Sequence, residues 1–276
     1  GTNGVIVAED GNILQTSNGG TSWRNLTRER IYDIAFRDVA AGFAVGANGF
    51  AMRTTNSGES WSVFTLPTSS TLRRIVFFTP SIGWIIGGGI VLKTIDGGDT
   101  WNPISIGTTS DLYDIASSPA GVKIIVGSKG TIIRSTNDGT SWEQLNSGDS
   151  YLIPSVTFVT ELKVLATGQG GYLYRSLDGG NTWNKTQSSS MYTTFTDIVF
   201  LDSLIGIVIG DGELRRTTNG GTTWSTINIG SVPPTFNRCT FVSPSAGFAV
   251  GSAVYKTTDK GASWNRLTSL TSFTAY

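Results

Sequence analysis

Few residues in this 276-residue sequence are of the types that usually perform catalysis. It contains no histidine, the usual general base at neutral pH and the commonest transition-metal ligand. Its single cysteine, Cys239, excludes an internal disulfide and a cysteine-rich zinc site. Because Cys239 stands where equivalent segments carry Ile or Val, we interpret it as a small buried hydrophobe and not as a nucleophile. We therefore expect no catalytic residue, no bound metal and no cofactor.

The regularly spaced acidic residues belong to one eight-residue pattern, S/T-x-D/N-x-G-x-S/T-W, which occurs seven times. The copy TIDGGDTW, residues 94–101, resembles a calcium loop, but such a loop needs more oxygen ligands and a terminal Glu. The Asn or Asp can accept hydrogen bonds from the following backbone N–H groups, and the Gly fits a position with positive φ. An active site is used once per fold, so the repetition predicts a structural turn whose Trp packs between repeats. The motif residues are Asn18, Asn56, Asp96, Asn137, Asp178, Asn219 and Asp259, with Trp23, Trp61, Trp101, Trp142, Trp183, Trp224 and Trp264.

A second set of polar residues varies from repeat to repeat and is the better candidate for binding. Its members stand one residue before an apolar position of the first strand that we expect in each repeat, and they are Asp33, Arg74, Asp114, Ser155, Asp197 and Arg238. Their alternating charges favour mutual pairing, and the alternative is a site for a small polar ligand near a central axis. Aromatic residues in or near connecting loops are further candidates, namely Tyr113, Tyr151, Tyr192, Phe195 and Phe236.

A basic residue precedes the motif in six copies. These residues are Arg53, Lys93, Arg134, Arg175, Arg216 and Lys256. The simpler interpretation is a long side chain that lies along the outer part of each sheet. The alternative is a basic rim that binds an acidic partner.

The motif spacing predicts the elements that carry these residues. Successive motif tryptophans lie 38 to 41 residues apart, and each repeat contains four short apolar runs separated by turn signals. The pairs Asp10-Gly11, Asn48-Gly49, Lys129-Gly130 and Asp211-Gly212 stand where a two-residue hairpin needs positive φ. A period of about 40 residues with four strands is typical of a β-propeller. We predict an all-β, seven-bladed β-propeller with four antiparallel strands per blade, formed by residues 1–276 as one domain.

The two ends of the sequence predict how the first blade is completed. Residues 4–12 match residues 42–50, so the chain starts at the second strand of its first blade. The tail, residues 272–276, resembles a first strand, and we expect it to close blade one beside the N-terminal strands. The alternative is a strand from another chain. Because the sequence begins at Gly1 without Met, we also expect that a leader was removed or the sequence trimmed.

Composition narrows the choice of partners. Twenty basic residues balance twenty acidic ones, so no net charge attracts the chain to nucleic acid. No apolar run approaches the roughly 20 residues of a transmembrane helix, so we expect no transmembrane segment. A protein partner or self-association is the expected contact, and a glycan is an alternative ligand.

The motif is identified as the Asp-box, also called the bacterial neuraminidase repeat. Sialidases share it, but the sequence has no Arg-Ile-Pro motif, and the xyloglucan-cleaving glycoside hydrolases pair two such rings. From Gly4 to Trp264 the chain resembles the photosystem II stability/assembly factor family and its non-photosynthetic bacterial relatives. The resemblance implies a single seven-bladed ring and a binding factor, not an enzyme; the arginine-rich patch of that family has no residue-by-residue match here.

Three functions follow as hypotheses. The first is a non-enzymatic binding or scaffold propeller that is secreted, periplasmic or on the cell surface, as part of an extracellular assembly. The second is a photosystem II assembly factor in a lumen. The third is a glycoside hydrolase or a glycan-binding lectin.

Overall fold

The computed structural model describes residues 4–7, 13–16, 24–25, 30–230 and 234–267. Apart from one short 3₁₀ turn, η1 (Ala47–Gly49), the regular elements of these residues are strands. The chain divides into two compact units, residues 1–113 and 114–276. Within the described residues no helix is long and apolar enough to cross a membrane.

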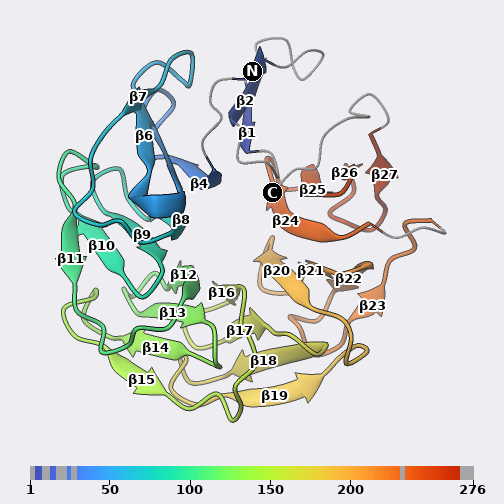
Figure 1. Cartoon of the computed structure of the whole chain (residues 1–276). Coiled ribbons are helices and arrows are strands. Elements are labelled where there is room, and N and C mark those ends of the chain that lie inside the picture. The colour runs from blue at the N-terminus through green and yellow to red at the C-terminus, as the bar shows by residue number, and fades with distance from the viewer. Residues whose placement is uncertain (1–3, 8–12, 17–23, 26–29, 231–233, 268–276) are drawn as a thin grey trace. The chain divides into compact units, whose positions relative to one another are not determined.

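The first unit contains one three-stranded sheet and two four-stranded sheets, each with its strands in sequence order (Figure 1). Neighbouring strands are antiparallel. The sheets are β1 (Gly4–Val7), β2 (Ile13–Thr16) and β3 (Arg24–Asn25); β4 (Ile31–Phe36), β5 (Gly42–Gly46), β6 (Ala51–Thr54) and β7 (Ser62–Val63); and β8 (Leu72–Phe77), β9 (Gly83–Gly87), β10 (Val91–Thr94) and β11 (Asn102–Ile104).

The remaining four sheets, all of four strands in sequence order, lie in the second unit, except that Leu112 and Tyr113 at the start of β12 belong to the first unit. They are β12 (Leu112–Ser117), β13 (Lys123–Gly127), β14 (Ile132–Ser135) and β15 (Glu143–Leu145); β16 (Val156–Phe158), β17 (Val164–Thr167), β18 (Tyr172–Ser176) and β19 (Asn184–Gln187); β20 (Phe195–Phe200), β21 (Gly206–Gly210), β22 (Glu213–Thr217) and β23 (Ser225–Thr226); and β24 (Phe236–Phe241), β25 (Gly247–Gly251), β26 (Val254–Thr257) and β27 (Asn265–Arg266).

The predicted all-β fold with four antiparallel strands per blade is confirmed, but the predicted count of seven such blades is wrong. The described residues form six four-stranded blades, and the first repeat forms the three-stranded sheet β1–β3. The reason is that the described residues before residue 30 supply three strand segments, β1, β2 and β3. The tail expected to complete this sheet, residues 272–276, lies outside the described residues, as does the Asp10-Gly11 turn.

The apolar core lies between neighbouring sheets. The second strands β5, β9, β13 and β21 are buried along their whole length, because each is covered on both faces. One cluster joins Phe43 and Val45 of β5 to Leu72 and Ile75 of β8. Each sheet therefore buries its faces against the next one within its unit, as the blades of a propeller do.

Two of the predicted hairpin turns have the expected backbone. Asn48 and Gly49 have φ of 54° and 72°, and Lys129 and Gly130 have φ of 56° and 66°. A two-residue turn of this hand matches the twist of the strands it joins. The Lys129-Gly130 turn contributes to the surface pocket described below.

Candidate functional site

The repeated turn has the same core of hydrogen bonds in each of its six described copies. In residues 94–101 the Thr94 hydroxyl donates to Asp96 over 2.6 Å and accepts from the Gly98 N–H over 2.8 Å. The Thr100 N–H donates to Asp96 over 3.0 Å. Equivalent bonds involve Asn56, Asn137, Asp178, Asn219 and Asp259. Asn18 and Trp23 of the first copy lie outside the described residues.

These hydrogen bonds keep the motif carboxylates ionised. The hydroxyl of Thr182 donates to Asp178 and lowers the pKa of that carboxyl from 3.8 to about 2. The Ser263 hydroxyl does the same for Asp259, whose pKa also falls to about 2. Hydrogen bonds to the charged form stabilise it, so these carboxylates are poor proton donors at neutral pH.

Two successive residues in each of the six described turns have positive φ, yet only the second is Gly in all of them. The first position holds Ser57, Gly97, Asp138, Gly179, Gly220 or Lys260. At the second position, a Cβ on Gly180 would lie 2.2 Å from Cδ1 of Ile124 on β13, and one on Gly221 would lie 2.5 Å from Cδ1 of Leu165 on β17. The second glycine therefore allows the turn to approach the preceding blade closely.

The motif tryptophans pack over the turns and into the core. The indole N–H of Trp183 donates to the Gly180 carbonyl over 2.9 Å, and Trp61, Trp142 and Trp264 make the same bond to their own turns. Trp101 meets Phe43 and Phe77 edge-on, with ring centroids 6.2 and 6.0 Å apart. The aromatic faces are thus used for packing between blades.

Two of the varying polar residues of the first unit meet as predicted. Asp33 of β4 accepts a hydrogen bond from the backbone N–H of Ile75 on β8 over 2.9 Å. The Arg74 guanidinium lies 3.4 Å from the same Asp33 carboxylate oxygen. This carboxylate therefore joins two neighbouring first strands.

The second unit repeats this arrangement at Asp114, Ser155, Asp197 and Arg238. Asp114 accepts from the Val156 N–H over 3.0 Å, and Asp197 accepts from the Cys239 N–H over 2.8 Å. The Ser155 hydroxyl lies 2.9 Å from an oxygen of each carboxylate. Arg238 lies 3.7 Å from Asp197. Both carboxylates are buried, and these contacts agree with mutual pairing; whether the residues bind a ligand stays a prediction.

Of the residues that directly precede this set, sequence reasoning named Tyr113 but missed Tyr32 and Arg73. The pairing of β4 with β5 and of β8 with β9 shifts register at Tyr32 and Arg73, so the strict alternation of strand faces breaks there. The two adjacent arginines at 73 and 74 in an apolar strand were the signal for this irregularity.

Arg73 forms an arginine–tyrosine cluster with Tyr32, Asp111 and Tyr113. Its guanidinium carbon lies 4.5 Å from the ring centre of Tyr113 and 6.0 Å from that of Tyr32. Asp111 lies 3.4 Å away as an ion-pair partner. The Arg73 Nε is buried and has no hydrogen-bond partner within the described part of the chain, while the side chain is 29% exposed. The cluster therefore presents a cation between two aromatic rings.

The other candidates divide into exposed and buried residues. Tyr151 and Tyr192 are exposed, but Phe195 and Phe236 are fully buried, because each begins a first strand and packs into the core. Cys239 is buried as predicted, and burial, aided by Asp197, raises the pKa of its thiol.

The basic residues before the motif make local contacts. Arg134 donates to the Gly179 carbonyl of the next blade over 2.9 Å, and Arg216 donates to the Lys260 carbonyl over 3.0 Å. Lys93 lies 4.8 Å from the centre of a Trp84 ring. These contacts fit the simpler interpretation of side chains lying along the sheets.

Comparison with known proteins gives one partial family match and several similar structures. The model described as "Photosynthesis system II assembly factor YCF48" matches residues 25–147, less than half of the chain. No curated protein matches the sequence.

Three similar solved structures have low sequence identity. "YCF48 bound to D1 peptide" is 22% identical, with a TM-score of 0.73 over 94% of this chain and 87% of that chain. YCF48 from Cyanidioschyzon merolae is 18% identical, with a TM-score of 0.72 over 94% and 89%. An ancestral GH74 enzyme is 15% identical, with a TM-score of 0.72 over 96% of this chain and 44% of that chain. These similarities show a β-propeller fold.

Proposed function

We propose that this chain is a non-enzymatic binding protein of the YCF48 assembly-factor type that holds a peptide segment of a protein partner. The observation that carries the proposal is the arginine–tyrosine cluster, which lies inside the region matched by the family model. One of the similar structures is a YCF48 bound to a D1 peptide, so a peptide is the ligand that we assign to this chain.

The cluster has the chemistry to hold a peptide carboxylate. A guanidinium offers five N–H donors in a planar fork that matches a carboxylate. Asp111 is 46% exposed and lies at the long distance of 3.4 Å, so an incoming carboxylate can share or replace this contact. The rings of Tyr32 and Tyr113 orient the guanidinium from its flanks.

The described carboxyl groups with a resolved pKa shift are poor candidates for the general acid of a glycoside hydrolase. A glycosidase needs one carboxyl group with a raised pKa as its general acid, beside a second carboxylate. Every described carboxyl with a resolved shift has a lowered pKa, namely Asp38, Asp96, Asp149, Asp178, Asp202 and Asp259. Cys239 is buried and supplies no nucleophile.

A binding measurement with a matched pair of variants tests the proposal. A synthetic D1 peptide with a free carboxyl terminus is titrated into the whole chain by calorimetry. We expect Arg73→Gln to weaken binding by about tenfold or more, because it removes a charge-assisted contact. Arg53→Gln, at an exposed site on β6, is expected to leave affinity unchanged. Equal affinity of all three proteins, or no binding by the natural sequence, would refute the proposal.

The cellular setting is tested separately. If the chain works in a lumen, a tagged copy expressed in a photosynthetic host recovers photosystem II subunits, and Arg73→Gln loses them. Recovery of surface proteins alone would instead favour the secreted or periplasmic scaffold.

A further inference from the structure

Residues 146–151, which lead from β15 toward β16, form a loop with a fixed conformation. The Gly148 N–H donates to the Asn146 side chain over 2.8 Å, and the Tyr151 N–H donates to the Asp149 carboxylate over 2.9 Å. The Gly130 N–H of the β13–β14 turn donates to the Tyr151 carbonyl over 2.8 Å. A Cβ on Gly130 would lie 2.1 Å from the Asp149 carbonyl oxygen, so turn and loop are in close contact. The loop is therefore preorganised.

Asp149 connects this loop to the next blade. Its carboxylate accepts from the Lys185 ammonium of β19 over 2.6 Å and from the Tyr174 hydroxyl of β18 over 3.0 Å. Burial alone would raise the pKa of Asp149, but the hydrogen bonds from Lys185, Tyr151 and Tyr174 outweigh it and lower the pKa. The carboxylate is thus ionised and neutralises Lys185.

Two tyrosines beside these contacts form an aromatic pair in which Tyr151 is exposed and Tyr172 is half-buried. The rings of Tyr151 and Tyr172 are stacked, with centroids 5.5 Å apart and an interplanar angle of 28°. The Lys185 ammonium lies 4.3 Å from the Tyr172 ring centre, and Tyr151 remains 42% exposed. We name Tyr151, Tyr172, Lys185 and Asp149 the tyrosine platform.

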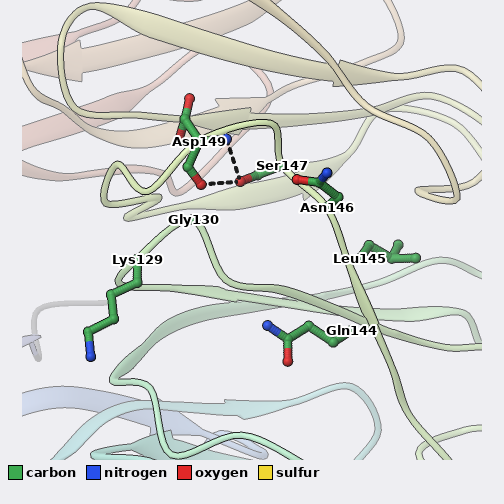
Figure 2. Close-up of a pocket in the computed structure, with 7 residues that line it drawn as sticks. All are labelled: Lys129, Gly130, Gln144, Leu145, Asn146, Ser147 and Asp149. Carbon is green, nitrogen blue, oxygen red and sulfur yellow. Dashed lines mark hydrogen bonds between the residues drawn. The ribbon is translucent and has the colours of Figure 1, made fainter.

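A polar pocket adjoins the platform and shares Asp149 with it. Its volume is about 390 Å³, and it is lined by Lys129, Gly130, Gln144, Leu145, Asn146, Ser147 and Asp149. Figure 2 shows the side chains of Lys129, Gln144 and Asn146 among the lining residues. Ser147 is bonded to the Asp149 backbone, which keeps this wall in place. The pocket is open to solvent and its lining is mostly polar, unlike the enclosed apolar clefts that usually hold small ligands.

We propose that the tyrosine platform and the adjoining pocket bind a neutral oligosaccharide, with one sugar ring on Tyr151 and the hydroxyls of the next sugar in the pocket. A pyranose has a flat C–H face that packs on an aromatic ring, and its hydroxyls both donate and accept hydrogen bonds. The pocket offers donors in the Lys129 ammonium and in the side-chain amide N–H groups of Gln144 and Asn146, and acceptors in the oxygens of the same amides.

A proline-rich peptide is the main competing ligand, because it also docks on aromatic side chains. Such a peptide needs a groove between aromatic ridges. Tyr151 and Tyr172 stack on each other and leave no space between their rings. The platform therefore offers one ring surface beside a polar pocket, which suits a sugar.

Calorimetry with defined probes tests this proposal on the whole chain. The probes are cellohexaose, maltohexaose and chitohexaose, and we expect at least one to bind with a Kd of about 10 µM to 1 mM, a range set by weak shallow sites. Tyr151→Ala is expected to lower that affinity at least tenfold, because it removes the ring on which the sugar packs. Gln144→Ala, which removes one polar partner at an exposed position, is expected to lower it several-fold.

Tyr192→Ala is the matched control, because Tyr192 is 88% exposed on a different loop of the same unit. It should leave oligosaccharide binding unchanged. The proposal is overturned if none of the three oligosaccharides binds at a probe concentration of about 10 mM, because the Kd would then be too weak for a specific site. It is also overturned if Tyr151→Ala binds as well as the natural sequence, or if Tyr151 is needed only for a polyproline peptide. Arg73→Gln should not alter oligosaccharide binding, because Arg73 is not part of the platform or the pocket. The oligosaccharide proposal and the peptide-binding proposal can therefore fail independently.

Discussion

Two factors can require Gly at a position of the repeated turn: positive φ and close contact with the neighbouring blade. Gly179 and Gly180 allow their effects on stability to be measured separately. The two residues are adjacent in one turn, with φ of 83° and 70°. A Cβ on Gly179 would find its nearest neighbour at 3.6 Å, an ordinary contact, whereas a Cβ on Gly180 would lie 2.2 Å from Ile124 Cδ1. Replacing each with Ala therefore imposes similar backbone strain but very different packing.

The expected destabilisation differs accordingly. An Ala in the left-handed region costs about 1 to 2 kcal/mol, and Gly179→Ala should lose only this amount. Gly180→Ala adds the overpacking of a full core, about 1 to 3 kcal/mol more, because Ile124 is completely buried and cannot swing into solvent. The total for Gly180→Ala is therefore about 2 to 5 kcal/mol.

Equilibrium unfolding in urea, followed by tryptophan fluorescence, measures both variants against the natural sequence. A second change, Ile124→Val, removes the clashing methyl group and should cost about 0.5 to 1.5 kcal/mol alone. Combined with Gly180→Ala it should cost less than the sum of the two, and combined with Gly179→Ala it should be additive. Equal destabilisation by the two glycine variants, or additivity in both pairs, would show that the neighbouring blade does not select the second glycine.

Three further outcomes are expected. Asp178→Asn should reduce the loss of stability in acid: the pKa of Asp178 falls from 3.8 to about 2 on folding, so its contribution is present above pH 3.8 and lost as the pH falls through about 2. Asn137 makes the equivalent bonds without a charge, so the stability of Asp178→Asn at pH 7 should barely change. The free energy of unfolding is measured in urea at a series of pH values, and an equal loss of stability in acid for both proteins would contradict the prediction. Asp197→Ala should destabilise by about 1 to 3 kcal/mol, because the buried Cys239 N–H loses its acceptor, whereas the Ser155 hydroxyl keeps Asp114. The exposed Asp211→Ala should cost less than about 0.5 kcal/mol, and similar losses for both would disprove the role of Asp197. Cys239 should react with a thiol reagent only after unfolding, because burial raises its pKa; rapid labelling of the folded protein would contradict its burial.

The sequence alone determined the architecture of each blade, because the signals involved are local. The motif TTNGGTTW at residues 217–224 contains nearly all the groups that bond within its turn, and its spacing sets the four-strand period. The pairing of Asp33 with Arg74 was also predictable, since equivalent positions of neighbouring repeats lie side by side. Burial of Cys239 followed from the Ile and Val residues at the equivalent positions.

Tertiary structure decided the features that depend on contacts between distant segments. The register shifts at Tyr32 and Arg73 moved these side chains out of the expected alternation, and a bulge is set by both paired strands. The tyrosine platform joins Tyr151 of one connecting loop to Tyr172 and Lys185 of the next blade, and no spacing rule relates them. The predicted count of four-stranded blades depended on a contact of the same kind, the pairing of the tail with the first repeat, and the described residues of that repeat form a three-stranded sheet. A repeat encodes its own turns and strands, whereas the close contact of Gly180 with Ile124 exists only once two blades have packed together.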